Sequence, residues 1–245
     1  MMNRVLLIIP AYNEEANISR VCSLLEEYRA SISEQSPYSV DFVVINDGSS
    51  DKTEQICREN GFPIISLARN LGIGGAVQTG YLYAHKMGYD VAVQFDGDGQ
   101  HDIYSLDKLL MPIWQDQTDL AIGSRFVGDC KDNFQSTFMR RVGIKFLSFM
   151  IRLFSGVKIK DCTSGYRAAN KKVIALFASD YPSDYPEPES IVNLSKKSLR
   201  CMEVPVRMYE REGGKSSIRA FKSVYYMIKV SLAIIIAGVQ KKEGA

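Results

Sequence analysis

The chain has 245 residues, of which 46% are hydrophobic, and this is enough to bury one well-formed domain. Its five cysteines form no C-x-x-C pair and it has only two histidines, which disfavours a disulfide framework and a structural zinc site. The net charge of +2 conceals an asymmetry, because residues 1–125 carry 9 basic and 17 acidic side chains whereas residues 126–245 carry 21 and 11.

In chain order, short apolar runs alternate with segments of helical periodicity. The runs are largely unbroken by polar residues, as in strands covered on both faces, and they span residues 5–9, 42–45, 64–67, 91–95 and 120–122. The segments between them, at residues 14–30, 51–60, 75–87 and 104–114, show the 3.6-residue period of helices. The alternation predicts an α/β fold with a mostly parallel, doubly wound sheet.

After residue 125 the pattern changes. It predicts a basic, apolar helix at residues 136–154, strands at 164–168 and 202–207, and a last apolar helix at 218–239. The most apolar part of that last helix, residues 230–239, is about half as long as the ~20 residues that span a bilayer. We therefore expect one domain over residues 1–217, followed by a C-terminal helix, 218–245, at a membrane surface or an oligomer interface.

Polar clusters follow four of the predicted strands, at residues 10–14, 46–49, 69–72 and 96–98. In doubly wound sheets, ligands bind beyond the carboxyl ends of the strands, so these clusters are expected to surround one pocket. Asp96 and Asp98 stand two residues apart, and on an extended chain their carboxylates point the same way. A hard cation such as Mg²⁺ or Mn²⁺ would relieve their repulsion and would bring a diphosphate with it. The alternative interpretation is an ordinary Asp-Gly turn. His101, beside the aspartates, is a candidate metal ligand or base, and the alternative for it is a solvated loop residue.

Taken together, these clusters resemble the motifs of family 2 glycosyltransferases, which have the GT-A nucleotide-diphospho-sugar transferase fold. The branch that is most similar contains dolichol-phosphate-mannose synthases and polyprenyl-phosphate sugar transferases, and the resemblance covers residues 5–217. Six motifs carry it: Pro10-Ala11-Tyr12-Asn13-Glu14, Asn46-Asp47-Gly48-Ser49, Arg69-Asn70-x-Gly72, Asp96-x-Asp98-x-Gln100, Ser164-Gly165-Tyr166-Arg167 and Arg211-x-x-Gly214-x-Ser216. The chain departs from the family at Asn46, which replaces an aspartate, and at Ser217, where the synthases commonly carry lysine.

The resemblance implies a nucleotide-sugar donor, UDP- or GDP-linked, and an Mg²⁺ or Mn²⁺ ion that stabilises the departing nucleoside diphosphate. The residues implied for the donor, with Asp47 accepting from the base edge, are Pro10, Tyr12, Glu14, Asp47, Arg69, Gly72 and Asp96. Those implied for the metal are Asp96, Asp98 and Gln100. Those implied for phosphate groups and the acceptor are Arg167, Arg211 and Ser216.

The need for a general base depends on the acceptor. A lipid phosphate is already largely ionised near pH 7 and needs none, whereas a sugar hydroxyl needs a carboxylate, for which Glu189 or Glu187 is the candidate. The Pro-Glu-Pro-Glu run is equally consistent with a helix start that places acids in its first turn. The preferred hypothesis is inverting transfer of a hexose or N-acetylhexosamine to polyprenyl phosphate, with Asp98, Glu189 and Arg211 as the expected catalytic group. A glycan acceptor and an inactive scaffold are the alternatives.

The excess of basic side chains in residues 126–245 suggests a polyanionic partner. The two helices predicted there mix basic residues with aromatic and aliphatic ones, which is typical of segments that lie in the headgroup region of an anionic leaflet. The same apolar faces are also suited to pack on the sheet, to form a homo-oligomer or to bind a small membrane protein. Nucleic acid is not an expected partner, because the aromatic residues form apolar stripes instead of alternating with basic residues on one strand face. With a first strand too short for a signal peptide, we predict a cytoplasmic protein, peripheral at the inner face of the membrane.

Overall fold

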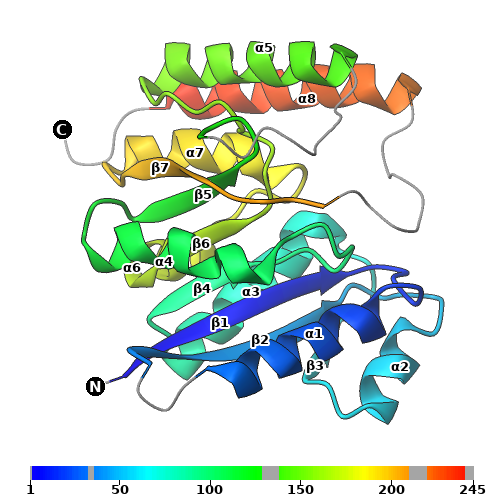
Figure 1. The fold of residues 1–245 in the computed structure, drawn as a ribbon. Coiled ribbons are helices and arrows are strands. Elements are labelled where there is room, and N and C mark those ends of the chain that lie inside the picture. The colour runs from blue at the N-terminus through cyan, green and yellow to red at the C-terminus, as the bar shows by residue number, and fades with distance from the viewer. Residues whose placement is uncertain (1, 33–35, 129–137, 210–219, 241–245) are drawn as a thin grey trace.

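The computed structural model describes residues 2–32, 36–128, 138–209 and 220–240, with the side chains of residues 138–140 and 220–224 left out. One seven-stranded sheet runs through the molecule in the order β3-β2-β1-β4-β6-β5-β7 (Figure 1). The strands are β1 Asn3–Ala11, β2 Tyr38–Asn46, β3 Ile64–Ser66, β4 Val91–Gln94, β5 Leu120–Ser124, β6 Arg167–Asn170 and β7 Cys201–Pro205. Among the described strands only β6 runs antiparallel to its neighbours, so the predicted mostly parallel sheet is confirmed.

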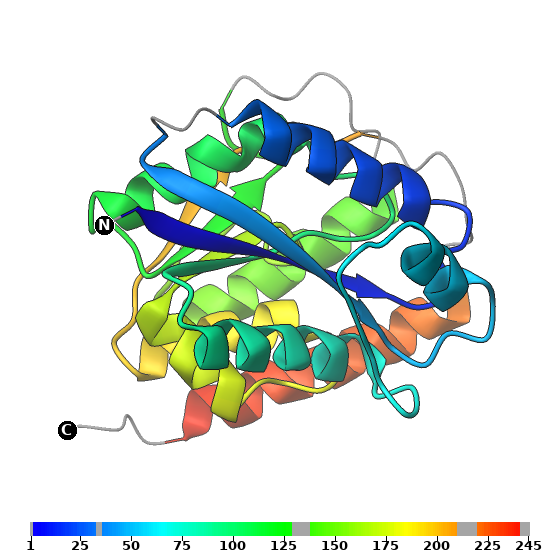
Figure 2. The same ribbon diagram turned by 90° about the horizontal axis from the view of Figure 1, so that it is seen from below.

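Helices cover both faces of this sheet (Figure 2). They are α1 Ile18–Ser31, α2 Thr53–Glu59, α3 Gly72–Met87, α4 Leu106–Trp114, α5 Phe138–Ser155, α6 Lys171–Ser179, α7 Pro186–Lys196 and α8 Ala220–Val239, with a short 3₁₀ turn, η1 Ile103–Ser105, before α4. Alternate residues of β1 enter different cores: Leu6 and Ile8 pack with α3 and α6, whereas Leu7 and Ile9 pack with α1 and α4. This alternation is what a strand buried on both faces requires.

The second half differs from the prediction in detail. The strand expected at residues 164–168 is β6, which starts only at Arg167, and its last residue, Asn170, begins a helix that the periodicity did not indicate. That helix, α6, starts where it does because the side chain of Asn170 accepts hydrogen bonds from the backbone N–H groups of Lys172 and Val173.

The two longest helices of the second half, α5 and α8, lie side by side at one end of the molecule (Figure 1). α8 packs against both α5 and α7, and its buried residues Val230 and Ile234 join the same core as α3 and α6. Within the described residues, no helix combines the length and the apolar character that crossing a bilayer requires.

Candidate active site

The carboxyl ends of β1, β2 and β4 lie at one edge of the sheet because these strands pair in parallel. The register places Ala11 beside Asn46, and the segments that follow are then joined by hydrogen bonds. The backbone N–H of Asn13 donates to Ser49 Oγ at 3.0 Å, and that of Glu14 donates to Thr53 Oγ1 at 2.9 Å. The structure thus brings two of the predicted polar clusters together, with Pro10 inside β1 and the ring of Tyr12 51% exposed beside them.

Asp47 joins the end of β2 to the loop that precedes α3. Its two carboxylate oxygens accept from the backbone N–H groups of Leu71 and Gly72, at 2.7 and 3.0 Å. Burial raises the pKa of Asp47, and these two hydrogen bonds oppose the rise. Gly48, which has a φ of +65°, permits the close approach, since a Cβ there would lie 2.8 Å from the backbone nitrogen of Asn70. The exposed Arg69 and the predicted Gly72 therefore belong to a loop that Asp47 positions.

Asn46, the departure from the family motif, has a structural explanation. Its amide nitrogen donates to Glu54 Oε2 at 3.3 Å and to Ser66 Oγ at 3.2 Å, while its oxygen accepts from the backbone N–H of Ser49 at 3.1 Å. An ionised aspartate has no donor, so it would face the carboxylate of Glu54 without a hydrogen bond. The amide is the group that satisfies all three neighbours.

His101 holds the loop that carries Asp96 and Asp98. Its Nδ1 accepts from the backbone N–H of Asp96 at 3.0 Å, and its ring stacks on Tyr166 with centroids 4.7 Å apart. Burial lowers the pKa of His101 to about 4, so the ring is neutral at physiological pH and its Nε2, the protonated nitrogen, faces Asp96 Oδ2 at 3.5 Å. The interpretation of His101 as a solvated loop residue is therefore wrong.

Within the same loop, Asp98 Oδ1 accepts from the backbone N–H of Gln100 at 3.1 Å. Gln100 is in turn tied to Tyr209, whose N–H donates to the Gln100 carbonyl at 2.8 Å. The side chain of Asp96 is 34% exposed and so accessible to a ligand. No cluster of three His, Cys, Asp or Glu side chains suited to a metal ion occurs among the described residues. Two carboxylates and Gln100 nevertheless fit a hard cation that takes the rest of its shell from diphosphate and water.

Asp96 has close neighbours on its buried side. Gln94 Nε2 donates to Asp96 Oδ1 at 3.2 Å, and a Cβ at Gly165 would lie 2.7 Å from Asp96 Oδ2. Gln94 Oε1 and Ser164 Oγ are buried and have no hydrogen-bond partner in the structure. Unpartnered buried polar atoms of this kind are costly, and they mark a place where a ligand or water is expected to bind.

The first turn of α7 brings Glu187, and not Glu189, to this place. The pKa of Glu187 is raised, mainly by burial, and the charge of Asp96 adds to the rise. The charge of Arg167 and a hydrogen bond from Gln94 oppose it. Residues two apart on a helix are related by a rotation of about 200°, so their side chains point to nearly opposite sides. Glu189 accordingly faces away from Asp96 and lines a small polar depression with Asn193 and residues of α8. The prediction that places Glu189 at the site is corrected by this geometry.

Arg167 has a structural role that the sequence did not indicate. Its side chain is 1% exposed, and its guanidinium donates to the carbonyl oxygens of Ser164, Glu187 and Cys162 and to Ser190 Oγ, all within 2.9 Å. These bonds fix the start of α7 to the segment that precedes β6. The predicted binding of an acceptor by Arg167 is therefore not supported, because the group faces the protein interior.

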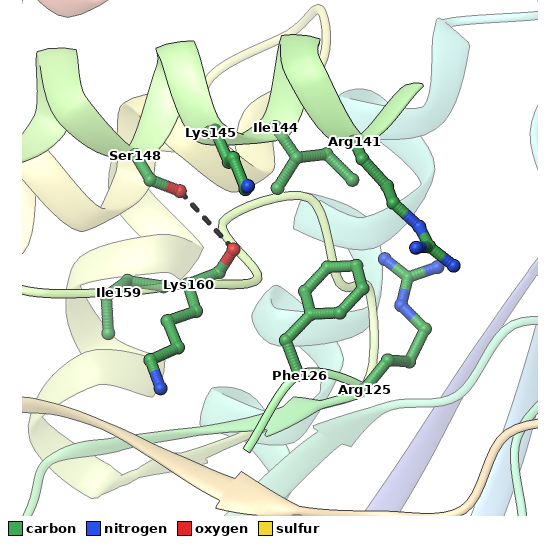
Figure 3. Close-up of a pocket in the computed structure, with 8 residues that line it drawn as sticks. All are labelled: Arg125, Phe126, Arg141, Ile144, Lys145, Ser148, Ile159 and Lys160. Carbon is green, nitrogen blue, oxygen red and sulfur yellow. Dashed lines mark hydrogen bonds between the residues drawn. The ribbon is translucent and has the colours of Figure 1, made fainter. Parts of the chain in front are cut away.

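A pocket of about 700 Å³ lies between α5 and the segments that follow β5 and precede β6 (Figure 3). Its lining combines basic and apolar side chains from these elements: Arg125, Phe126, Arg141, Ile144, Lys145, Ser148, Ile159 and Lys160. Arg125 is fixed there by Asp161, whose two oxygens accept from its Nε and Nη2 at 2.7 Å each. None of the predicted site residues lines this pocket, and the basic, apolar character of α5 was the only sequence signal for it.

The pocket and the aspartate loop are neighbours in the fold. Arg125 follows β5, Asp96 follows β4, and only β6 separates these strands. The charges of Asp98 and Arg125 both act on the pKa of His101, which places both charges near that ring. The predicted Arg211 and Ser216 lie outside the described residues.

Comparisons with known proteins identify relatives along nearly the whole chain. The sequence profile described as glycosyl transferase family 2 matches residues 6–177. A UDP-N-acetylglucosamine–dolichyl-phosphate N-acetylglucosaminyltransferase from Methanococcus voltae is 28% identical over 95% of this chain and 98% of its own. A polyprenol monophosphomannose synthase from Mycolicibacterium smegmatis is 30% identical over 93% of this chain and 86% of its own. Among solved structures, glucosyl-3-phosphoglycerate synthase from Mycobacterium tuberculosis, in complex with Mn²⁺, UDP-glucose and glycerol 3-phosphate, aligns with a TM-score of 0.64 at 19% identity, over 99% of this chain and 82% of that chain.

Proposed function

This chain belongs to glycosyl transferase family 2, and from that membership we propose that it transfers a sugar from a nucleotide sugar to polyprenyl phosphate. The sugar is a hexose or an N-acetylhexosamine, and the donor is UDP- or GDP-linked. The observation that carries this proposal is the pairing of an accessible aspartate loop with a basic, apolar pocket two strands away. The names of the two relatives, which specify dolichyl phosphate and polyprenol phosphate as acceptors, support the same substrate class.

The donor is proposed to bind at the carboxyl ends of β1, β2 and β4. Asp47 and the loop it positions would contact the nucleoside, together with Pro10, Tyr12 and Glu14. Asp96, Asp98 and Gln100 would hold Mg²⁺ or Mn²⁺ with the diphosphate of the donor. When bound, the metal supplies positive charge that stabilises the departing nucleoside diphosphate. Arg211 and Ser216 are proposed to contact phosphate oxygens as well, on the family motif alone.

The acceptor phosphate is proposed to bind in the pocket beside Arg125. A phosphate on a long prenyl chain needs cationic groups for its head and apolar surface for the first part of its tail. Arg141, Lys145 and Lys160 supply the former, while Phe126 and Ile144 contribute to the latter. Since Arg125 keeps a bidentate bond with Asp161, its guanidinium is held in one orientation in the lining of this pocket.

A phosphate nucleophile simplifies the reaction that we propose. Near pH 7 it is largely ionised, so an inverting attack on the anomeric carbon requires no proton removal by the protein. The neutral His101 and the buried Glu187 then serve to position Asp96 and the sugar. A glycan hydroxyl as acceptor would need a base, and the orientation of Glu189 away from Asp96 weighs against that alternative.

We also propose that the reaction takes place at the cytoplasmic face of the membrane, where the acceptor's headgroup is accessible. Four cysteines of the described residues, Cys22, Cys57, Cys162 and Cys201, are free thiols. Unpaired cysteines are typical of a reducing compartment, which supports this assignment.

The test is a transfer assay with a panel of radiolabelled nucleotide sugars, polyprenyl phosphate as acceptor, and Mg²⁺ or Mn²⁺. We expect label in the lipid fraction that disappears on chelation of the metal and in Asp98→Ala. As a variant of the acceptor pocket, Lys145→Ala is expected to raise the KM for polyprenyl phosphate without changing that for the donor. Metal-dependent nucleotide binding without lipid product from any donor in the panel would contradict the proposal.

A further inference from the structure

The outward face of α5 is unusually apolar for a protein surface. Val142, Phe146, Phe149 and Leu153 follow one another at intervals of three and four residues and therefore share one side of the helix. All four are exposed, Phe149 and Leu153 by more than 60%. The opposite side of the helix carries Ile144, Leu147 and Ile151, which are buried in the core, so the exposed stripe is additional to what folding needs.

α8 presents a matching stripe. Ile228, Leu232, Ile236 and Val239 have the same spacing and are between 54% and 73% exposed. The helices pack in parallel: Gly143 of α5 faces Met227 of α8 near one end, and Gly238 of α8 faces Phe154 of α5 near the other. The two stripes thus cover the same length, on the order of 20 Å at 1.5 Å per residue. Together they form a two-helix apolar face, larger than the isolated apolar side chains that protein surfaces normally carry.

The charged side chains that α5 and α8 themselves carry are all of one sign. Neither α5 nor α8 contains an aspartate or a glutamate. Arg141, Lys145 and Arg152 are exposed and fall on one side of α5, between the apolar stripe and the side that is buried in the core. Arg141 and Lys145 of this row also line the pocket beside Arg125. Going around α5, one meets the apolar stripe, then the basic row, then the pocket.

This order matches the layers of a lipid leaflet, where acyl chains are followed by anionic headgroups. Long basic side chains next to an apolar stripe let the stripe enter the acyl boundary while their charges stay among phosphates. A second copy of the chain is a poorer occupant, because two such faces would bring basic rows together without a carboxylate on either helix.

We propose that the outward face of α5 and α8 docks on an anionic lipid bilayer and so presents the pocket beside Arg125 to lipid phosphates at the headgroup level. This inference deepens the proposed function, on which the identity of the lipid phosphate as substrate rests. The docking itself rests on the apolar stripes and the basic row.

The test is flotation of the purified full-length protein with vesicles of phosphatidylcholine, with and without phosphatidylglycerol. We expect binding to the anionic vesicles that weakens at high salt, and little to the zwitterionic ones. Phe149→Glu and Ile236→Glu are each expected to reduce binding by at least about tenfold, since each puts a charge in the apolar stripe. Arg152→Ala should reduce it about fivefold, as one basic residue contributes near an anionic surface. The matched control is Met111→Glu, which adds the same charge at a 51% exposed apolar position on α4, across the sheet, and should bind like the wild type.

A second readout separates this inference from the proposed function. Sugar transfer to a short-chain, water-soluble polyprenyl phosphate is expected to be unchanged in the Phe149 and Ile236 variants. Wild-type protein that transfers sugar in solution but fails to float with anionic vesicles would overturn the docking proposal alone. Undiminished flotation of both the Phe149→Glu and the Ile236→Glu variant would also overturn it. So would a wild-type dimer, observed by sedimentation, that the Phe149→Glu substitution dissociates. Absence of transfer in solution, with flotation intact, would instead count against the proposed function.

Discussion

Replacing Gly165 by alanine tests whether the position of Asp96 matters. Gly165 lies in the segment before β6, and its backbone does not need glycine's left-handed conformations, since it has no positive φ. A Cβ there would lie 2.7 Å from Asp96 Oδ2 and 3.1 Å from Oδ1. It would also lie 2.9 Å from the amide nitrogen of Gln94, the donor to Asp96. A single methyl group would therefore press on the carboxylate that we propose as a metal ligand.

The size of the effect follows from these distances. Ordinary carbon–oxygen contacts are about 3.3 Å or more, so Asp96 must move by roughly 0.6 Å or turn away from the loop. Displacements approaching 1 Å in catalytic groups lower rates by up to about 100-fold. We expect kcat/KM of Gly165→Ala to fall about 10- to 100-fold, equivalent to about 1.4 to 2.7 kcal/mol of transition-state stabilisation. The concentration of metal that gives half-maximal activity should rise as well.

The assay is transfer of labelled sugar to polyprenyl phosphate at a series of Mn²⁺ concentrations, with a thermal melt of each variant. Gly97→Ala is the matched control, because a Cβ at Gly97, between the two aspartates, meets no atom closer than 3.4 Å. It should retain most of the activity. A folded Gly165→Ala protein with wild-type kcat/KM and wild-type metal dependence would refute the assignment of Asp96 to the reacting centre.

Three further predictions use substitutions elsewhere in the chain. Glu187→Gln should lower kcat/KM by about tenfold or more, and it should remove the loss of activity at acid pH that the raised pKa of Glu187 predicts. The control, Glu189→Gln, should stay within about twofold of the wild type. Equal effects of the two substitutions on the pH–rate profile would contradict the orientation of α7. Arg125→Lys cannot keep both bonds to Asp161 and should raise the KM for polyprenyl phosphate roughly tenfold with little change for the donor, as steady-state kinetics would report. Burial alone would raise the pKa of Asp119, but hydrogen bonds from Arg200 lower it. The ionised carboxylate therefore stabilises the fold at pH values above its ordinary pKa. This stabilisation is lost as the pH falls through the lowered pKa. Asp119→Asn should therefore cost about 1 to 2 kcal/mol at neutral pH and flatten the acid dependence of unfolding by urea; an unchanged acid limb would contradict this.

The first half of the fold was predictable from the sequence because its signals are local. The run predicted at residues 91–95 is β4, Val91–Gln94, and the one at residues 5–9 lies within β1, Asn3–Ala11. Unbroken aliphatic runs indicate strands buried on both faces whatever their neighbours are. Sheet order is not local, and nothing near Arg167 in the chain indicates that β6 inserts antiparallel between β4 and β5.

The site was predictable in its motifs but not in its orientations. The placement of Glu187 toward Asp96, with Glu189 facing away, depends on α7 starting at Pro186, and a shift of one or two residues would exchange them. The burial of Arg167 depends on carbonyl oxygens from two separate segments, the stretch before β6 and the first turn of α7. The pocket beside Arg125 is formed by elements far apart in the chain, so its basic lining was visible only as an excess of charge.

The acceptor is the central claim, and one measurement tests it most directly. Purified protein is incubated with labelled nucleotide sugar, metal and either polyprenyl phosphate or the corresponding free polyprenol, and the labelled lipid is then treated with mild acid. The account predicts label only with the phosphate, in a glycosyl phosphate linkage that mild acid cleaves to release the sugar. Equal labelling of the free alcohol, or a linkage that resists mild acid, would contradict it.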